Sequence, residues 1–309
     1  FYGCVSVWLA NGLAAIVRAT GQMKIAAKNL VAGSIVQVIA AAVLIFGLGP
    51  FPNMGIAGAA AGIVIGQAVA SALLLYYLMA RCSELRLRLL AIPIKLAPMA
   101  AILKVGALSS VNSFCSLAAI IVITGFMARH GVDVLAGYGI GARLEFLIIP
   151  LIFGFGAAST ALVGVHFGAG EIKRAHRVGW TAALYSAGLT GLIGVLVAIF
   201  PDLWANLFSD VEAVRAACRA YLQIVGPFYA FFGMALCLYF ASLGSGRVLW
   251  PVLAVILRVA VVTAGCIYLS SGESAGIEQF YWLIAVGIVT QAFVTGAAVK
   301  LGAWTRGLN

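Results

Sequence analysis

The chain is divided into long apolar stretches, and no other feature limits its possible fold as strongly. A helix needs about 20 mostly apolar residues to cross the hydrocarbon layer of a bilayer. Nine stretches approach or exceed this length, at about 1–17, 29–48, 56–80, 105–128, 134–162, 178–200, 213–241, 248–270 and 277–302. Charged residues make up only 9% of the chain, too few to cover a surface that faces water. We therefore predict an all-α fold, a polytopic transmembrane helix bundle of about nine spans.

Two of these spans contain a proline at which the helix cannot continue undisturbed. Proline has no backbone N–H, so it removes a hydrogen bond from the helical ladder. We expect the fifth span to bend near Pro150 and the seventh to be kinked at Gly226-Pro227.

The basic residues alternate between loops, which indicates how the chain is oriented. Of 19 Lys and Arg residues, 14 lie in alternate loops, and the opposite loops hold only Arg129, Arg215 and Arg219. Cytoplasmic loops carry the excess of positive charge in membrane proteins. We predict that residue 1 starts outside, that the C-terminus is cytoplasmic, and that the net charge of +10 reflects topology rather than a nucleic-acid partner.

The connection at 81–104 differs from the tight turns elsewhere. It is long and basic, and apolar residues such as Leu87 and Ile92 lie between its charges. This pattern is typical of a segment lying on a membrane surface. We predict a cytoplasmic linker between two helix bundles.

An internal repeat relates the first three spans to the last three. Residues 19–31 resemble residues 242–254, with Gly21 opposite Gly244 at an offset of 223. Further matched pairs are Lys24 with Arg247, Gly62 with Gly287, and Gln67 with Gln291. The middle three spans have no such partner, so we expect three further helices before residue 1, as in a 6 + 6 architecture built from repeats.

The sequence shows no enzyme or metal signature. The three histidines lack metal-ligand spacing, and no CxxC pair occurs among the cysteines. Gly244-Ser245-Gly246-Arg247 lacks the Lys-Ser/Thr of a phosphate loop, and no catalytic triad or nucleotide motif is present. We predict no enzymatic activity and no cofactor or metal.

Glu145 is the one acidic residue placed deep in a predicted span. It lies about 11 residues into the fifth stretch, roughly 17 Å along a helix and near the middle of the bilayer. A carboxylate at this depth faces a cavity or a partner. Arg143 points to nearly the opposite helix face, whereas Arg258 is in a position to reach Glu145 across the bundle. Cation coupling and a structural ion pair with Arg258 both remain open.

The fourth span carries a stripe of polar residues on one helix face. Its members are Ser109, Asn112, Ser113 and Ser116. Such a stripe forms hydrogen bonds between helices or lines a translocation cavity. We place these residues, together with Arg258, in a candidate substrate cavity.

Two segments resemble a known transporter family. Gly-Leu-Gly-Pro-Phe-Pro-Asn-Met-Gly-Ile-Ala-Gly-Ala-Ala at 47–60 is similar to the region between the fifth and sixth helices of MATE (multidrug and toxic compound extrusion) transporters. Val-Gly-Val-His-Phe-Gly-Ala-Gly at 163–170, followed by Lys173 and Arg174, resembles that family's cytoplasmic turn after the eighth helix. The resemblance covers nearly the whole chain, from the fourth helix of the family to the twelfth.

The resemblance implies a protein of two pseudo-symmetric lobes in the plasma (inner) membrane. Residues 1–80 would be the remnant of the N-terminal lobe, 81–104 the inter-lobe linker, and 105–309 the C-terminal lobe. It also implies a secondary active antiporter that exports drugs or organic cations in exchange for H⁺ or Na⁺.

The chain departs from the Na⁺-coupled members of that family at two positions. Where those proteins carry carboxylates in the seventh and tenth helices, this chain has Ser116 and Gly233. Tyr229 does match an aromatic residue of that site and joins the candidate substrate cavity. Glu145 is therefore our candidate for cation coupling.

Two alternatives remain open. A lipid-linked oligosaccharide flippase of a related fold would line its cavity with several basic residues, and only Arg143 and Arg258 lie within spans here. A transport-inactive truncated fragment is the other alternative, because three helices of the 6 + 6 pattern are not represented.

The topology is testable by cysteine labelling. A cysteine at Gly170, in the basic turn at 166–177, should react with an impermeant thiol reagent only after the membrane is opened, because this turn is predicted to be cytoplasmic. Ready labelling of intact cells would overturn the assignment.

Overall fold

The computed structural model describes residues 3–48, 52–81, 96–271, 276–302 and 304, and every element in these ranges is a helix. Eight helical segments are long and apolar enough to cross a membrane. The first predicted span corresponds to α1 (Cys4–Ala19), whose 16 residues rise only about 24 Å. The predicted all-α transmembrane bundle is confirmed.

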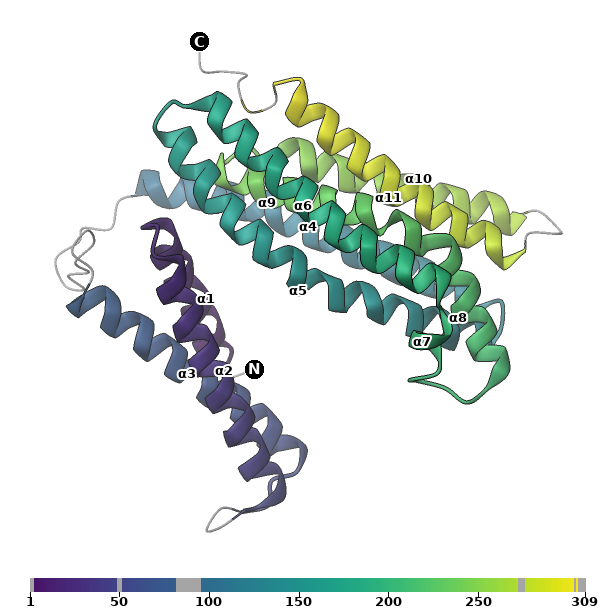
Figure 1. Cartoon of the computed structure of the whole chain (residues 1–309), viewed down its shortest axis with the longest axis horizontal. Coiled ribbons are helices and arrows are strands. Elements are labelled where there is room, and N and C mark those ends of the chain that lie inside the picture. The colour runs from purple at the N-terminus through teal and green to yellow at the C-terminus, as the bar shows by residue number, and fades with distance from the viewer. Residues whose placement is uncertain (1–2, 49–51, 82–95, 272–275, 303, 305–309) are drawn as a thin grey trace. The chain divides into compact units, whose positions relative to one another are not determined.

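The chain divides into two compact units, residues 1–95 and 96–309 (Figure 1). The first contains α1, α2 (Met23–Phe46) and α3 (Ile56–Ala80). Their assignment to the remnant of an N-terminal lobe stays a prediction.

The first unit is held together by glycines on one face of α3. A Cβ added at Gly62 would lie 2.6 Å from the Cα of Ala41 on α2, and one at Gly66 would lie 2.6 Å from the backbone oxygen of Gly33. Gly58 makes a third such approach one turn earlier. Helices in lipid associate through close backbone packing at small residues, because burial from water does not drive their contact.

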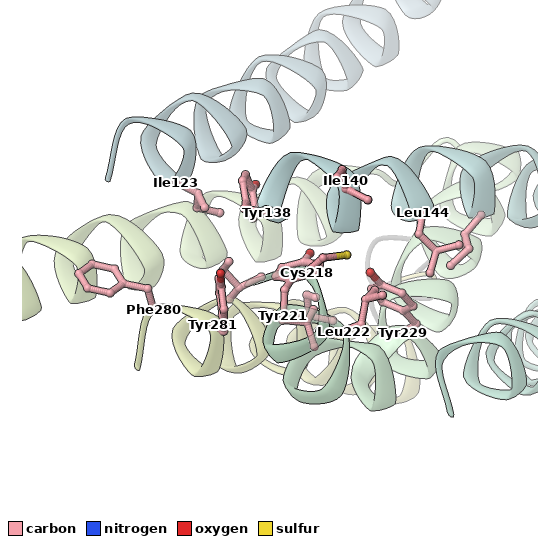
Figure 2. Packing of buried hydrophobic residues seen from close by; sticks show 14 of the residues in the cluster. Ile123, Tyr138, Ile140, Leu144, Cys218, Tyr221, Leu222, Tyr229, Phe280 and Tyr281 are labelled. Carbon is pink, nitrogen blue, oxygen red and sulfur yellow. The ribbon is translucent and has the colours of Figure 1, made fainter. Parts of the chain in front are cut away.

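The second unit contains the remaining helices. These are α4 (Leu96–Ala128), α5 (Val132–Gly168), α6 (Ile172–Ile199), α7 (Asp202–Ala205), α8 (Glu212–Val225), α9 (Tyr229–Gly244), α10 (Leu249–Ser271) and α11 (Ile277–Lys300). Its core is formed by buried residues from all eight of these helices, several of which are shown in Figure 2.

Helix boundaries differ from the prediction where charged residues extend a helix beyond the apolar run. The predicted linker at 81–104 is only partly described, because 82–95 lie outside the described residues and 96–104 already belong to α4. Lys173 and Arg177 likewise belong to the first turns of α6 rather than to a loop. Basic side chains at a helix end reach the interface while the backbone remains helical.

The two prolines behave differently. Helix α5 continues through Pro150 over its 37 residues, and the bend expected there stays a prediction. At Gly226-Pro227, α8 ends and a 3₁₀ turn, Gly226–Phe228, precedes α9, so the predicted break at this position is confirmed. The backbone of Gly226 also passes close to Gly194 on α6, where a Cβ would lie 2.0 Å from the Gly226 oxygen.

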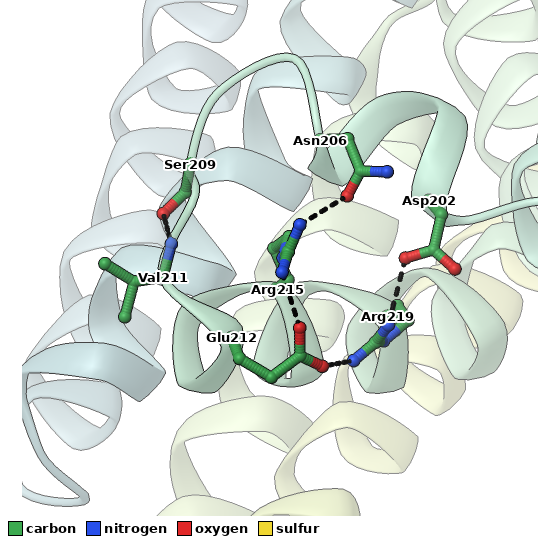
Figure 3. A network of polar contacts seen from close by, with 7 residues as sticks. All are labelled: Asp202, Asn206, Ser209, Val211, Glu212, Arg215 and Arg219. Atoms are coloured by element: carbon green, nitrogen blue, oxygen red, sulfur yellow. Dashed lines mark hydrogen bonds and ion pairs between the residues drawn. The ribbon is translucent and has the colours of Figure 1, made fainter.

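An exposed polar network fixes α7 against the first turns of α8 (Figure 3). Arg219 donates to Asp202 at 3.0 Å and also pairs with Glu212. Arg215 donates to Glu212 at 2.7 Å and to Asn206 at 3.4 Å. Arg215 and Arg219, two of the three basic residues in the loops opposite to the basic ones, are therefore paired with acidic neighbours.

The backbone corrects the register of the internal repeat. Gly21 and Gly246 both adopt positive φ, +80° and +70°, each in the turn after its helix. Gly21 therefore corresponds to Gly246 rather than to Gly244. The resulting offset of 225 keeps the match of Gly62 with Gly287 and removes those of Lys24 with Arg247 and Gln67 with Gln291.

The turn between α5 and α6 refines the labelling experiment. Gly170 has φ +77°, so a cysteine there would be strained. Ala169 is exposed and has an ordinary φ of −80°, which makes it the better labelling position in the same turn.

Trp304 closes a small core of the second unit and should contribute strongly to its stability. It is fully buried against Gly179 of α6 and donates from Nε1 to the Ser242 hydroxyl at 3.2 Å. We expect Trp304→Ala to destabilise the protein by about 3 kcal/mol through lost packing. The midpoint of thermal unfolding in detergent should fall by several degrees, and Trp8→Ala, at a side chain that is 78% exposed, should leave it unchanged. Equal midpoints for the two variants would contradict this.

Candidate functional site

The second unit encloses a cavity of about 220 Å³ between five helices. Its walls come from α4, α5, α9, α10 and α11, and most of its lining is apolar. The polar lining residues are Asn112, Ser116, Tyr138, Glu145, Tyr239, Arg258 and Gln291. Glu145 and Arg258, predicted from the sequence, thus lie in one cavity.

Glu145 is held by a tyrosine from another helix. The Tyr221 hydroxyl on α8 donates a hydrogen bond to Oε1 of Glu145. Tyr221 is itself buried and makes edge contacts with Tyr138 and Tyr281, with ring centroids 5.5 and 5.4 Å apart (Figure 2). The carboxyl group is therefore oriented by a rigid aromatic cluster.

Glycine on α5 makes room for this tyrosine. A Cβ at Gly141, one turn before Glu145, would lie 2.3 Å from Cδ1 of Tyr221. Gly137 allows a similar approach one turn earlier, where a Cβ would lie 2.6 Å from the Ala217 Cβ. The spacing of these glycines brings α8 against the same part of α5 that carries Glu145.

Arg258 lines the cavity without forming an ion pair with Glu145. It donates from one terminal nitrogen to Oε1 of Gln291 on α11 at 3.0 Å. Its Nε is buried and has no hydrogen-bond partner among the described residues. The ion pairs recorded for the described part of the chain do not include these two residues. The described residues therefore show no permanent ion pair between Glu145 and Arg258, and cation coupling by Glu145 stays a prediction.

Only part of the polar stripe on α4 reaches the cavity. Asn112 and Ser116 line it, whereas Ser109 and Ser113 are absent from its lining. Three of the serine hydroxyls donate to carbonyls of their own helix, Ser109 to Val105 at 2.8 Å, Ser113 to Ser109 at 3.3 Å and Ser116 to Asn112 at 2.9 Å. A substrate contact of Ser109 or Ser113 stays a prediction.

Tyr229 lies in the protein core rather than on the cavity wall. It is fully buried, and its carbonyl accepts a hydrogen bond from Thr190 of α6 at 2.9 Å. One turn later, a Cβ at Gly233 would lie 2.3 Å from the Thr190 hydroxyl. Gly233, the position that the resemblance aligned with a carboxylate of Na⁺-coupled family members, is therefore packed against α6 without room for a side chain.

Arg143 takes no part in the cavity. Its guanidinium lies over the ring of Phe208, 5.5 Å from the centroid, and the residue is exposed. Arg258 is thus the single basic residue among those lining the described cavity. This is fewer than a flippase for an anionic head group would be expected to need.

Sequence reasoning missed four polar contributors, Tyr138, Tyr221, Tyr239 and Gln291. The glutamine was matched in the repeat but received no role, although a polar side chain in an apolar span is itself a signal. Tyr221 lies 76 residues from its partner Glu145, so no local pattern could connect them.

The helix crossing at Arg258 differs in its residues from the corresponding crossing in the other copy of the repeat. At an offset of 225, Arg258 and Gln291 correspond to Gly33 and Gly66. In the first unit these two glycines bring α2 and α3 into backbone contact. In the second unit the same crossing, between α10 and α11, holds the Arg258–Gln291 hydrogen bond.

Removing the Tyr221 hydroxyl tests the hydrogen bond between Tyr221 and Glu145. Tyr221→Phe leaves a buried carboxyl group without its donor, which should cost about 1–3 kcal/mol. Tyr281→Phe is the matched control, because its hydroxyl makes only a 3.5 Å contact with the Ala217 carbonyl. Thermal midpoints in detergent should fall for Tyr221→Phe alone, and a larger loss for Tyr281→Phe would refute the assignment.

Comparison with known proteins identifies the family. A family model described as MatE matches residues 107–269. The chain is 26% identical to the probable multidrug resistance protein NorM of Thermotoga maritima, over 70% of this chain and 46% of that protein. It is 24% identical to the probable multidrug resistance protein YoeA of Bacillus subtilis and 24% to the FAD transporter of Shewanella oneidensis, covering 84% and 71% of this chain and 57% and 49% of those proteins.

Solved structures show the same fold. The MATE transporter ClbM in complex with Rb⁺ matches with a TM-score of 0.83 at 18% identity, over 97% of this chain and 66% of that one. An outward-facing multidrug resistance MATE family transporter of the MOP superfamily matches with a TM-score of 0.89 at 18% identity, over 98% and 67%. The chain spans about half the length of the curated relatives it matches. Because the MatE model covers more than half of its 309 residues, this integral membrane protein belongs to the MATE (multidrug and toxic compound extrusion) family.

Proposed function

We propose that the chain acts in a secondary active antiporter that exports drugs or organic cations in exchange for H⁺ or Na⁺. The observation that carries this proposal is the Glu145 carboxyl group, which lines an internal cavity and has one hydrogen-bond donor and no ion-pair partner among the described residues. Two of the relatives are named as probable multidrug resistance proteins, which supports the substrate class.

Glu145 has the chemistry that coupling requires. Burial makes a bare carboxylate unfavourable, so the group takes up a proton or a cation to neutralise its charge. Arg258 faces the same cavity but is engaged with Gln291, which leaves Glu145 available for exchange. A group that binds a proton in one state and a cation in another links the two flows in alternating access.

The size of the cavity favours a coupling site over a complete drug site. Ligand pockets for drug-sized molecules occupy about 300–1,000 Å³, whereas this cavity has about 220 Å³. We assign Glu145 to coupling, and Asn112, Ser116 and Arg258 to the contacts that a substrate makes at the cavity wall.

The topology belongs to the same proposal. Residues 1–80 form part of an N-terminal lobe and 105–309 a C-terminal lobe, joined by 81–104 on the cytoplasmic face of the plasma (inner) membrane. The distribution of basic residues supports a cytoplasmic C-terminus.

Arg258 favours a second candidate, the export of an anionic compound. One relative is named as an FAD transporter, and the buried Nε of Arg258 is a free donor beside the cavity. Binding of an anionic substrate would require Arg258 and would not change when Glu145 is replaced.

Binding of an organic cation to the purified chain separates these candidates. Tetraphenylphosphonium should bind more weakly as the pH falls, because protons then compete for Glu145. Glu145→Gln should weaken binding about tenfold and remove the pH dependence. Glu171→Gln is the matched control, at an exposed carboxyl group that already pairs with Arg174 at 3.0 Å. It should change neither the affinity for tetraphenylphosphonium nor its pH dependence.

If Na⁺ at constant pH weakens the binding of tetraphenylphosphonium, Na⁺ is identified as the coupling ion. If Na⁺ has no effect on this binding, H⁺ is identified instead. Wild-type affinity and pH dependence in Glu145→Gln would overturn the coupling role. Binding of FAD that is lost in Arg258→Gln and kept in Glu145→Gln would favour the anionic candidate.

A further inference from the structure

A second cavity in the second unit is an open groove of about 580 Å³ between α5 and α6. Its walls are almost entirely apolar and come from these two helices alone. Its lining residues include Leu151, Gly154, Phe155 and Leu162 from α5, and Arg177 and Thr181 from α6. It shares no lining residue with the cavity that contains Glu145.

The polar groups of the groove are arranged by depth. Arg177 lies near the first turn of α6, where the helix leaves the α5–α6 turn, and is exposed with no ion pair recorded among the described residues. Thr181 follows one helical turn later, about 6 Å deeper along α6. Beyond this level the lining is apolar apart from Tyr185.

A buried hydroxyl on the opposite wall also lacks a partner. Ser159 of α5 is 1% exposed, and its Oγ makes no hydrogen bond with any described residue. Ser159 lies nine residues before the end of α5 and Thr181 nine residues after the start of α6, so the two stand at a similar depth on the antiparallel helices. The Ser159 Oγ is enclosed by protein, so the hydroxyl that a ligand in the groove can reach at this depth is that of the exposed Thr181.

We propose that this groove binds an anionic glycerophospholipid. Its phosphate pairs with Arg177, its ester carbonyls lie at the level of Thr181 and Ser159, and an acyl chain fills the apolar part. Basic side chains at helix ends recognise anionic head groups, and the groove end with Arg177 is the end predicted to be cytoplasmic, where anionic lipids are concentrated.

Charge complementarity selects this occupant over a neutral lipid or a protein segment. Arg177 is joined at the same end of α6 by the exposed Lys173, while Arg174 is already paired with Glu171. A zwitterionic lipid would bring a second positive charge to these groups, and an apolar helix would leave them unmatched.

Native mass spectrometry of the purified full chain with phosphatidylglycerol and phosphatidylethanolamine tests the proposal. We expect phosphatidylglycerol to be retained about fivefold over phosphatidylethanolamine. Arg177→Gln should abolish this preference, and Arg174→Gln, which removes the same charge from the same helix end outside the groove, should preserve it. Equal retention of the two lipids by the wild type, or an unchanged preference in Arg177→Gln, would overturn the proposal.

A second pair of variants tests the location independently of charge. Gly154 lines the groove and has no atom within 4 Å of an added Cβ, so Gly154→Leu adds bulk to the groove from a position that accepts a Cβ. Gly188 is equally open but lies outside the groove and is the control. Bound phosphatidylglycerol should fall severalfold in Gly154→Leu and stay unchanged in Gly188→Leu. Unchanged lipid binding in Gly154→Leu would show that the lipid sits elsewhere, or that protein already covers the groove.

Discussion

A bilayer offers the peptide backbone no hydrogen-bonding partner, so each spanning segment must satisfy its own polar groups as a helix. Helices built in this way attract one another mainly by packing, and packing depends on how closely their backbones approach. Gly62 and Gly66 serve this purpose in the first unit, and Gly137 and Gly141 do so in the second. The position of Tyr221 beside Glu145 follows from the approaches at Gly137 and Gly141.

The Glu145 site shows this dependence in a chain of three steps. Gly141 leaves space for the Tyr221 ring, the ring positions its hydroxyl, and the hydroxyl donates to Glu145. A polar group in a medium of low dielectric is costly when it lacks a partner, so orientation and stability of the carboxyl group have the same cause. The coupling chemistry proposed for Glu145 thus depends on a residue that has no polar atom in its side chain.

The sequence predicted the elements of the fold better than their contacts. Hydropathy located eight spanning segments, and proline chemistry predicted the break at Gly226. Periodicity placed Ser109 and Asn112 on one face of α4 but could not tell which of them a neighbouring helix encloses, and only Asn112 lines the cavity. Tyr229 was placed by resemblance alone, and the packing of α6 against α9 buries it instead. Side-chain partners across helices are set by backbone distances that hydropathy does not encode.

The helix crossing that differs between the two repeats has a mechanical consequence. At Gly33 and Gly66 the backbones of α2 and α3 are in contact, so the two helices cannot shift toward each other without a clash. Where Arg258 meets Gln291, two long side chains span the crossing, and a change of rotamer lengthens or shortens the link. The two copies of the repeat thus differ in what joins their helices at this crossing, backbone in the first and a pair of long side chains in the second. The first crossing leaves the helices no room to shift, whereas the spacing of the second depends on two side chains whose hydrogen bond lies beside the cavity that contains Glu145.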